Sequence, residues 1–179
     1  MVNSPSYHGC IVGAGVAGSA MASYLGKNGK KVVVVEKSLA EKDRILGELL
    51  QPGGVQMLRK MGLESTLENI DAQPVIGYGM FLDGNSFQIG YETKDKGLTG
   101  FGFRNGKFVQ SLRAYMQSLP NVTVFEAAAS SLIEEEGIVK GINYSDSNDQ
   151  PQQIRARLTI VSDGALSIFR KDLSTSEKK

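Results

Sequence analysis

The chain has 179 residues, a length that fits one domain of ordinary size. Its 20 Lys and Arg residues nearly balance 19 Asp and Glu residues, so the formal net charge of +1 favours neither nucleic acid nor an anionic membrane surface as a partner. A single cysteine, Cys10, excludes an internal disulfide, and no apolar run reaches the roughly 18 residues of a membrane-spanning helix.

The first elements in chain order are a strand, a helix and a second strand. An apolar run at 9–15 predicts a buried strand, and 16–28 predicts a helix that Gly29 ends. Residues 30–37, "KKVVVVEK", predict a strand that is apolar on both faces, as central parallel strands are. This order predicts a βαβ unit.

The rest of the chain departs from a regular alternation of strands and helices. The predicted elements are a helix at 53–62, a hairpin at 75–91 turning at Asp83-Gly84-Asn85, a short strand within 95–103, a helix at 107–119, a strand at 122–127, a β-meander at 131–158 with a turn near Glu136-Gly137, and a strand at 158–164. We expect one domain over 1–179, with 70–104 inserted into it as a piece of a second subdomain.

Gly13, Gly15 and Gly18 form a G-x-G-x-x-G pattern between the first strand and the first helix. In such a loop the first glycine permits the tight turn, the second lets a pyrophosphate approach the backbone, and the third lets the helix pack close to the strand. The helix N-terminus then offers free N–H groups to the phosphates. Because the flanking elements are the required ones, the pattern predicts a dinucleotide site rather than a structural turn.

Glu36 ends the second predicted strand, where a carboxylate can accept hydrogen bonds from the ribose hydroxyls of an adenosine. An acid at this position disfavours the 2′-phosphate of NADP, so FAD and NAD remain as candidates. The long excursion between residues 37 and 121, followed by a meander and a strand ending in Asp163-Gly164, favours an FAD fold over a plain NAD domain.

The pattern is most specific in five blocks of sequence. These are "DRILGELLQPGGVQMLRKMGLE" (43–64), "DAQPVIGYGMFLDG" (71–84), "GKFVQSLR" (106–113), "LPNVTVFEA" (119–127) and "IVSDGALSIFRKDL" (160–173). Together they closely resemble squalene monooxygenase, the family also called squalene epoxidase, over nearly the whole chain. The resemblance implies an α/β, Rossmann-like FAD-binding fold of the glutathione-reductase and aromatic-hydroxylase type, with three layers and a β-meander.

The resemblance also implies a role for each matching residue. The implied FAD-binding residues are Gly13, Gly15 and Gly18 at the phosphates, Glu36 and Lys37 at the ribose, Arg44 at the pyrophosphate, Leu49 beside the flavin, Arg113 and Ala129 at further contacts, and Asp163 in an Asp-Gly motif. Tyr78 matches a tyrosine that shapes the active site near the substrate. Gly53 and Gly54 would start a helix beneath the flavin, where a side chain would collide with it.

The family reaction converts squalene and O2 to 2,3-epoxysqualene in sterol biosynthesis, on FAD that NADPH reduces through NADPH-cytochrome P450 reductase. Family members are held at the endoplasmic reticulum (microsomal) membrane and are more than twice as long. The resemblance therefore implies a fold truncated before the last parallel strand and most of the substrate domain, and a missing C-terminal half. Lys107 also stands where the family has an arginine.

Three other functions remain open at this point. The chain is alternatively a non-catalytic FAD-binding or nucleotide-binding remnant, another flavin monooxygenase of the same fold, or a plain NAD-binding module. No metal site is expected, because His8 is the only histidine.

Overall fold

The computed structural model describes residues 7–42, 45, 47–91 and 97–170. The chain divides into two compact units, the first made of residues 1–40 and 112–179 and the second of residues 41–111. The boundary falls inside helix α3 (Asn105–Gln117). The predicted inserted piece, 70–104, lies within the second unit, which begins earlier, at Glu41.

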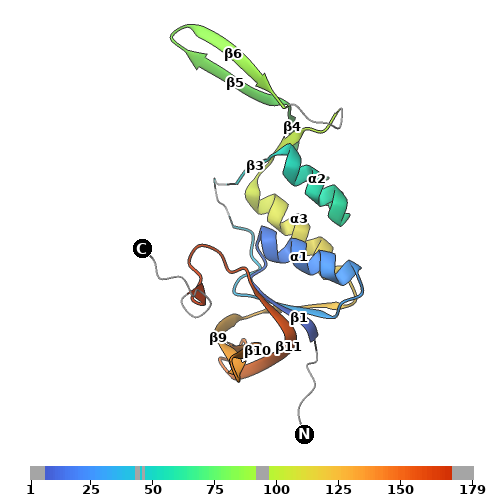
Figure 1. The fold of residues 1–179 in the computed structure, drawn as a ribbon, viewed down its shortest axis with the longest axis vertical. Helices are drawn as coiled ribbons and strands as arrows, with labels where there is room; N and C mark the ends of the chain where they lie inside the picture. The colour runs from blue at the N-terminus through green and yellow to red at the C-terminus, as the bar shows by residue number, and fades with distance from the viewer. Residues whose placement is uncertain (1–6, 43–44, 46, 92–96, 171–179) are drawn as a thin grey trace. The chain divides into compact units, whose positions relative to one another are not determined.

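A six-stranded sheet, counted over the described residues, forms the centre of the first unit (Figure 1). Its strands, in spatial order, are β8 (Val122–Glu126), β2 (Val32–Glu36), β1 (Tyr7–Val12), β11 (Pro151–Val161), β10 (Ile138–Ser145) and β9 (Ala128–Glu135). Strands β8, β2, β1 and β11 pair in parallel, while β9, β10 and β11 pair antiparallel as the predicted meander. Helix α1 (Val16–Lys27) connects β1 to β2 and completes the predicted βαβ unit.

Strand β11 corrects the sequence prediction of a meander ending at 158 and a separate strand at 158–164. The structure has one continuous strand, in which Arg155 lies opposite Gly141 of antiparallel β10 and Leu158 lies opposite Gly9 of parallel β1. A strand has two hydrogen-bonding edges, and β11 uses one edge for each partner. No turn is therefore needed between the meander and the parallel sheet.

Alternate residues of β1 and β2 point to opposite faces of the sheet and build two cores. The face toward the helices holds Ile11, Ala14, Ala22, Val32, Val34 and Met116. The other face holds Cys10, Val12, Val33, Val35, Ala127, Ile142, Ile154, Ala156 and Phe169. Helices, parallel sheet and meander thus form the three predicted layers, and the apolar "VVVV" run is buried because both faces are covered.

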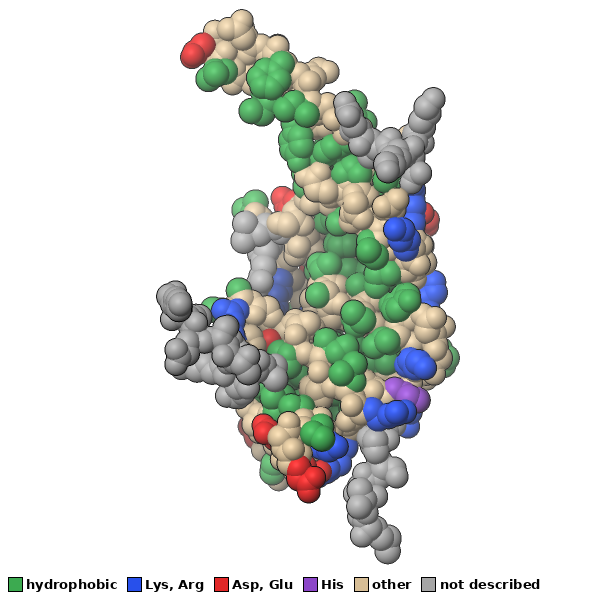
Figure 2. Space-filling model, in the orientation of Figure 1, with side chains coloured by type: hydrophobic (Ala, Val, Ile, Leu, Met, Phe, Trp, Pro, Cys, Tyr) green, Lys and Arg blue, Asp and Glu red, His purple; other side chains and the backbone are tan. Residues whose placement is uncertain are grey.

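The second unit contains small sheets and short helices. Its elements are β3 (Leu49–Leu50), α2 (Pro52–Met61), the 3₁₀ helix η1 (Glu64–Leu67), β4 (Gln73–Val75), β5 (Gly77–Leu82), β6 (Asn85–Gly90), β7 (Gly100–Gly102) and the start of α3. Strands β3, β7 and β4 form one sheet, and β5 and β6 form a hairpin on which hydrophobic side chains gather (Figure 2).

The local signals predicted from glycine and proline are confirmed. Pro52 lies in the first turn of α2, and Gly62 ends that helix in the left-handed conformation at φ 67°. Asp83 and Gly84 have φ values of 47° and 77°, as a two-residue hairpin turn requires, and the turn at 136–137 between β9 and β10 is built in the same way. No helix among the described residues has both the length and the apolar character needed to cross a membrane.

Candidate cofactor site

The glycine-rich loop between β1 and α1 is fixed by close backbone packing. Gly13 has φ +96°, and a Cβ atom there would lie 2.6 Å from the Ser162 carbonyl oxygen. A Cβ atom on Gly18 would collide with the Gly13 carbonyl oxygen. Ser162 in turn donates its hydroxyl hydrogen bond to the Val12 carbonyl at 3.0 Å. Gly13 thus permits the turn and Gly18 the close helix packing, as the sequence predicted.

Gly15 differs from the other two glycines because open space surrounds it. It is the N-cap of α1 with φ −74°, and a Cβ atom there would meet no atom within 4 Å. No side chain caps this helix, and its first turn contains no acidic residue. No capping side chain therefore accepts hydrogen bonds from the first N–H groups of α1. These N–H groups can donate to the phosphates of a dinucleotide.

Glu36 and Arg113 form a buried pair behind the loop. Glu36 Oε2 accepts a hydrogen bond from the Ala14 amide at 2.6 Å and lies 3.8 Å from Arg113 Nη2, while Oε1 accepts from the Ser38 amide at 3.0 Å. The Arg113 Nε atom donates to the Ala14 carbonyl at 2.8 Å, and Nη1 donates to Ala40 at 3.4 Å. The backbone N–H and the backbone carbonyl of the loop residue Ala14 are thus both hydrogen-bonded to this pair.

The burial of this pair bears on the FAD-binding roles that were predicted for Glu36 and Arg113. Glu36 is 8% exposed and Arg113 is 5% exposed, so both side chains belong to the interior of the unit. Each carboxylate oxygen has two acceptor sites, so Glu36 keeps acceptor capacity for ribose hydroxyls. For Arg113, the visible role is to hold the loop and the acid in place.

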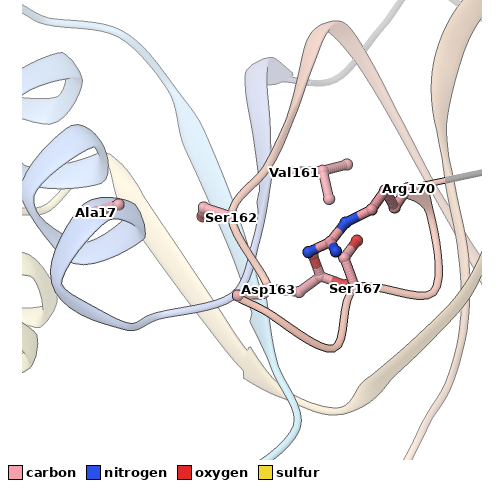
Figure 3. A pocket seen from close by; sticks show the side chains of 7 residues that line it. Ala17, Val161, Ser162, Asp163, Ser167 and Arg170 are labelled. Carbon is pink, nitrogen blue, oxygen red and sulfur yellow. The ribbon is translucent and has the colours of Figure 1, made fainter. Parts of the chain in front are cut away.

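A pocket of about 650 Å³ opens beside the loop, between the first turn of α1 and the segment that follows β11. Its lining residues are Ala17, Val161, Ser162, Asp163, Gly164, Ser167 and Arg170 (Figure 3). Arg170 is anchored by a hydrogen bond from Nη2 to the Ala165 carbonyl at 2.8 Å. The pocket thus combines a helix N-terminus with a guanidinium group, the chemistry that binds phosphate.

The pocket contains one predicted residue and two that the sequence analysis did not assign. Asp163, which was predicted to contact the cofactor, lines the pocket, whereas Ser167 and Arg170 had no predicted role. Both lie in the block "DGALSIFR", so their spacing after Asp163 was the available signal. Lys37 is exposed after β2, and Ala129 lies half-buried in β9 opposite Tyr144, so neither lines the pocket.

The second unit holds the other predicted residues. Leu49 lies in β3 opposite Gly102 and is 40% exposed, and Tyr78 lies in β5. A Cβ atom on Gly53 would meet open space, whereas one on Gly54 would collide with the side chain of Leu50. The predicted need for open space above the helix therefore fits Gly53, while packing within the unit explains Gly54. Arg44 lies outside the described residues.

Tyr78 is linked to two neighbours. Its hydroxyl oxygen accepts a hydrogen bond from Gln51 Nε2, and its ring meets Tyr91 edge-on with centroids 5.5 Å apart. The nearby Tyr91 hydroxyl, and then the hydrogen bond from Gln51, lower the pKa of Tyr78 against the opposing effect of desolvation. Lys107, at the position where an arginine was expected, forms an ion pair with Asp71.

Comparison with known proteins identifies the family. The FAD binding domain family matches residues 6–179. This chain belongs to that family. The predicted α/β FAD-binding fold is confirmed, and FAD is the cofactor that the family name specifies. The open Gly15, the uncapped α1 N-terminus and the neighbouring pocket fit that cofactor.

Individual relatives confirm the predicted resemblance to squalene monooxygenases. Squalene epoxidase 3 of Arabidopsis thaliana is 47% identical over 165 residues, which cover 91% of this chain and 31% of that protein. The squalene epoxidase of Schizosaccharomyces pombe is 42% identical over 166 residues, or 90% of this chain and 36% of that protein. The chain thus spans about a third of the length of these relatives.

Solved structures share the fold at much lower sequence identity. The p-nitrophenol 4-monooxygenase PnpA of Pseudomonas putida matches with a TM-score of 0.80 and 19% identity, covering 92% of this chain and 42% of that one. The flavin-dependent brominase Bmp2 matches with a TM-score of 0.77 and 21% identity, over 92% and 40% of the two chains. At this identity the likeness supports the fold alone.

Proposed function

We propose that this chain is the FAD-binding portion of a squalene monooxygenase, which epoxidises squalene to 2,3-epoxysqualene in sterol biosynthesis. The observation that carries the proposal is the 47% identity to a squalene epoxidase over 91% of the chain. The geometry of the glycine-rich loop supports the cofactor. Because the chain spans 31% of that relative, we assign it the binding of FAD within the whole reaction.

In this proposal the loop and the residues around it hold the cofactor. The α1 N-terminus at Gly15 binds the pyrophosphate, Glu36 accepts hydrogen bonds from the adenosine ribose with Lys37 beside it, and Arg113 keeps Ala14 and Glu36 in register. Further FAD contacts are assigned to Gly13, Gly18, Arg44, Leu49, Ala129 and Asp163. Tyr78 is the residue assigned to the substrate side of the site.

The chemistry comes from the cofactor rather than from these side chains. FAD held by these residues would, once reduced, supply the chemistry that transfers one oxygen atom of O2 to squalene and releases the other as water. The protein binds and orients the flavin and keeps water away from it. The electrons are proposed to come from NADPH through NADPH-cytochrome P450 reductase, at the endoplasmic reticulum membrane.

The proposal is tested first by cofactor binding and then by turnover. We expect the purified chain to retain FAD through gel filtration with a visible flavin spectrum, and to bind FAD more tightly than FMN, which lacks the adenosine. Epoxysqualene is then measured by mass spectrometry after addition of squalene, NADPH, O2 and the reductase. Retained flavin without product would favour a non-catalytic FAD-binding remnant, and absence of flavin binding would contradict the proposal.

Gly15→Val supplies the matched control for this experiment. Its backbone, with φ −74°, accepts any residue, and the space around it is open, so the variant keeps the melting temperature of the FAD-free chain. The added side chain blocks the approach of the pyrophosphate. We expect FAD affinity to fall at least about tenfold, which corresponds to ~1.4 kcal/mol.

A further inference from the structure

Three segments of the second unit converge on one group of polar side chains. Gln51 is the N-cap of α2, Tyr78 lies in β5, and Tyr91 directly follows β6. The Gln51 amide nitrogen donates to the Tyr78 hydroxyl oxygen. The Tyr91 backbone amide donates to the Ile76 carbonyl at 2.9 Å, which extends the hairpin pairing and places the Tyr91 ring beside Tyr78.

The Tyr91 ring is packed against Tyr78 and Gly100, but its hydroxyl group has no hydrogen-bond partner among the described residues. The two tyrosine rings meet at 85° with their centroids 5.5 Å apart, an edge-to-face arrangement. A Cβ atom on Gly100 would lie 3.2 Å from Tyr91 Cε2, so the glycine makes room for this ring. The Tyr91 hydroxyl oxygen is buried, and no described residue gives it a hydrogen bond of acceptable geometry.

A small adjustment of the two side chains would make the Tyr78 hydroxyl the hydrogen-bond partner of the Tyr91 hydroxyl. The two hydroxyls are near enough for each to shift the pKa of the other, although they fall short of a well-formed hydrogen bond. The pKa of Tyr91 is raised, first by its interaction with Tyr78, and the pKa of Tyr78 is lowered, first by Tyr91 and then by Gln51. Tyr91 is the donor because its buried hydroxyl proton has no other acceptor among the described residues, whereas Tyr78 is exposed and its proton can reach solvent. The two pKa directions agree with this assignment, since a donor holds its proton more tightly and an acceptor less tightly.

We propose that Tyr91 is a positioning residue, whose hydroxyl donates to the Tyr78 oxygen and so leaves the Tyr78 proton free to bind an acceptor atom of a ligand. The Tyr78 oxygen then accepts from both Gln51 and Tyr91, and its own proton must point elsewhere. Tyr78 is 43% exposed, so a ligand can approach this residue.

Because the Tyr78 hydroxyl donates to the ligand, the ligand must carry an acceptor atom. Which ligand this is rests on the proposed function. Squalene is a hydrocarbon and has no acceptor atom, whereas the epoxide oxygen of its product is an acceptor. Tyr78 would therefore recognise the oxygenated end of the product rather than the substrate. The role of Tyr91 itself needs only the three side chains of this group.

The test is the ionisation of Tyr78 in the chain without cofactor. The chain is labelled with ¹³C at Cζ of tyrosine, the Tyr78 signal is assigned with Tyr78→Phe, and its pKa is measured by NMR titration. Tyr91→Phe keeps the ring and removes only the hydroxyl. We expect the Tyr78 pKa to rise in this variant toward the ordinary value of tyrosine, and to rise also in Gln51→Leu.

Controls separate a positioning role from general destabilisation. Tyr24→Phe, at an exposed tyrosine of α1, should leave the Tyr78 pKa unchanged. An unchanged or lower Tyr78 pKa in Tyr91→Phe would overturn the proposal. In the unsubstituted chain, Tyr78 must also titrate before Tyr91, and the reverse order would overturn it even if Tyr91→Phe failed to fold. Neither measurement needs FAD or turnover, so failure here is distinct from failure of the proposed function.

Discussion

At the scale of single residues, the buried pair of Glu36 and Arg113 determines whether the glycine-rich loop keeps its shape. Arg113 donates to the Ala14 carbonyl, and Glu36 accepts from the Ala14 amide. Arg113→Leu would leave a nearly buried carboxylate without its cation and a carbonyl without its donor. We expect this variant to lower the free energy of unfolding by about 3 kcal/mol, the loss typical of breaking a buried pair, as measured by urea denaturation.

A double-substitution cycle identifies the pair as the cause. Glu36→Gln alone removes the charge and leaves Arg113 buried without its partner, so it should also destabilise the chain. Combining Glu36→Gln with Arg113→Leu removes both charges, so the double variant should lose less stability than the sum of the two single losses. Strictly additive losses would show that the two side chains act independently.

At the scale of elements, an ion pair joins the loop before β4 to the first turn of α3. Lys107 lies close to Asp71, and its hydrogen bond and charge lower the pKa of that carboxyl from the ordinary value of 3.8. A lowered carboxyl pKa means that the stabilisation is present above pH 3.8 and is lost as the pH falls through the lower value of the folded state. We therefore expect the thermal midpoint to fall in this acid range.

Asp71→Asn tests the origin of that pH dependence. The variant should melt slightly below the original chain at neutral pH, because an exposed ion pair contributes little. The two chains should converge once the pH has fallen below the lowered pKa of the folded state, where the carboxyl is protonated. If the difference in melting temperature instead stayed constant over the whole range, the ion pair would not be its source. Calorimetry across a series of pH values provides the measurement.

Elements specified by local chemistry were predictable, and elements specified by distant partners were not. The turn at 83–84 and the end of α2 at Gly62 follow from residues that adopt positive φ easily, so the sequence alone located them. Strand β11 was split in the prediction because its composition changes from polar to apolar near Leu158. Only the positions of β10 and β1 on its two edges show that it is one strand.

The residues of the candidate site also divide into those that local sequence identifies and those that depend on distant partners. The three glycines and Glu36 were identified because their spacing encodes the turn and the strand end. That Arg113 is buried against Ala14, 99 residues away in the chain, could not be predicted, because nothing local distinguishes it from a surface arginine on an amphipathic helix. The buried hydroxyl of Tyr91 was missed for the same reason, since its environment comes from Tyr78 and Gly100.

At the scale of the whole molecule, the hairpin leaves a large apolar surface exposed. The cross-strand register places Tyr78, Met80, Leu82, Phe87 and Ile89 on one face, the apolar hairpin face, and each of these side chains is at least 43% exposed. Figure 2 shows hydrophobic side chains along this hairpin. Such patches on soluble proteins are sites of association, so we expect the isolated chain to self-associate as its concentration rises.

The directly opposed pair Met80 and Phe87 offers a sharp test of that expectation. Replacing them together by Met80→Lys and Phe87→Glu puts opposite charges across the strands, which preserves the hairpin while removing apolar surface. At roughly 1.5 kcal/mol for each side chain, self-association should weaken at least about 100-fold, as measured by sedimentation velocity. Gln88→Lys, on the other face, adds charge without removing apolar surface and should leave the association unchanged. If Gln88→Lys disperses the chain equally well, net charge rather than the apolar hairpin face controls association.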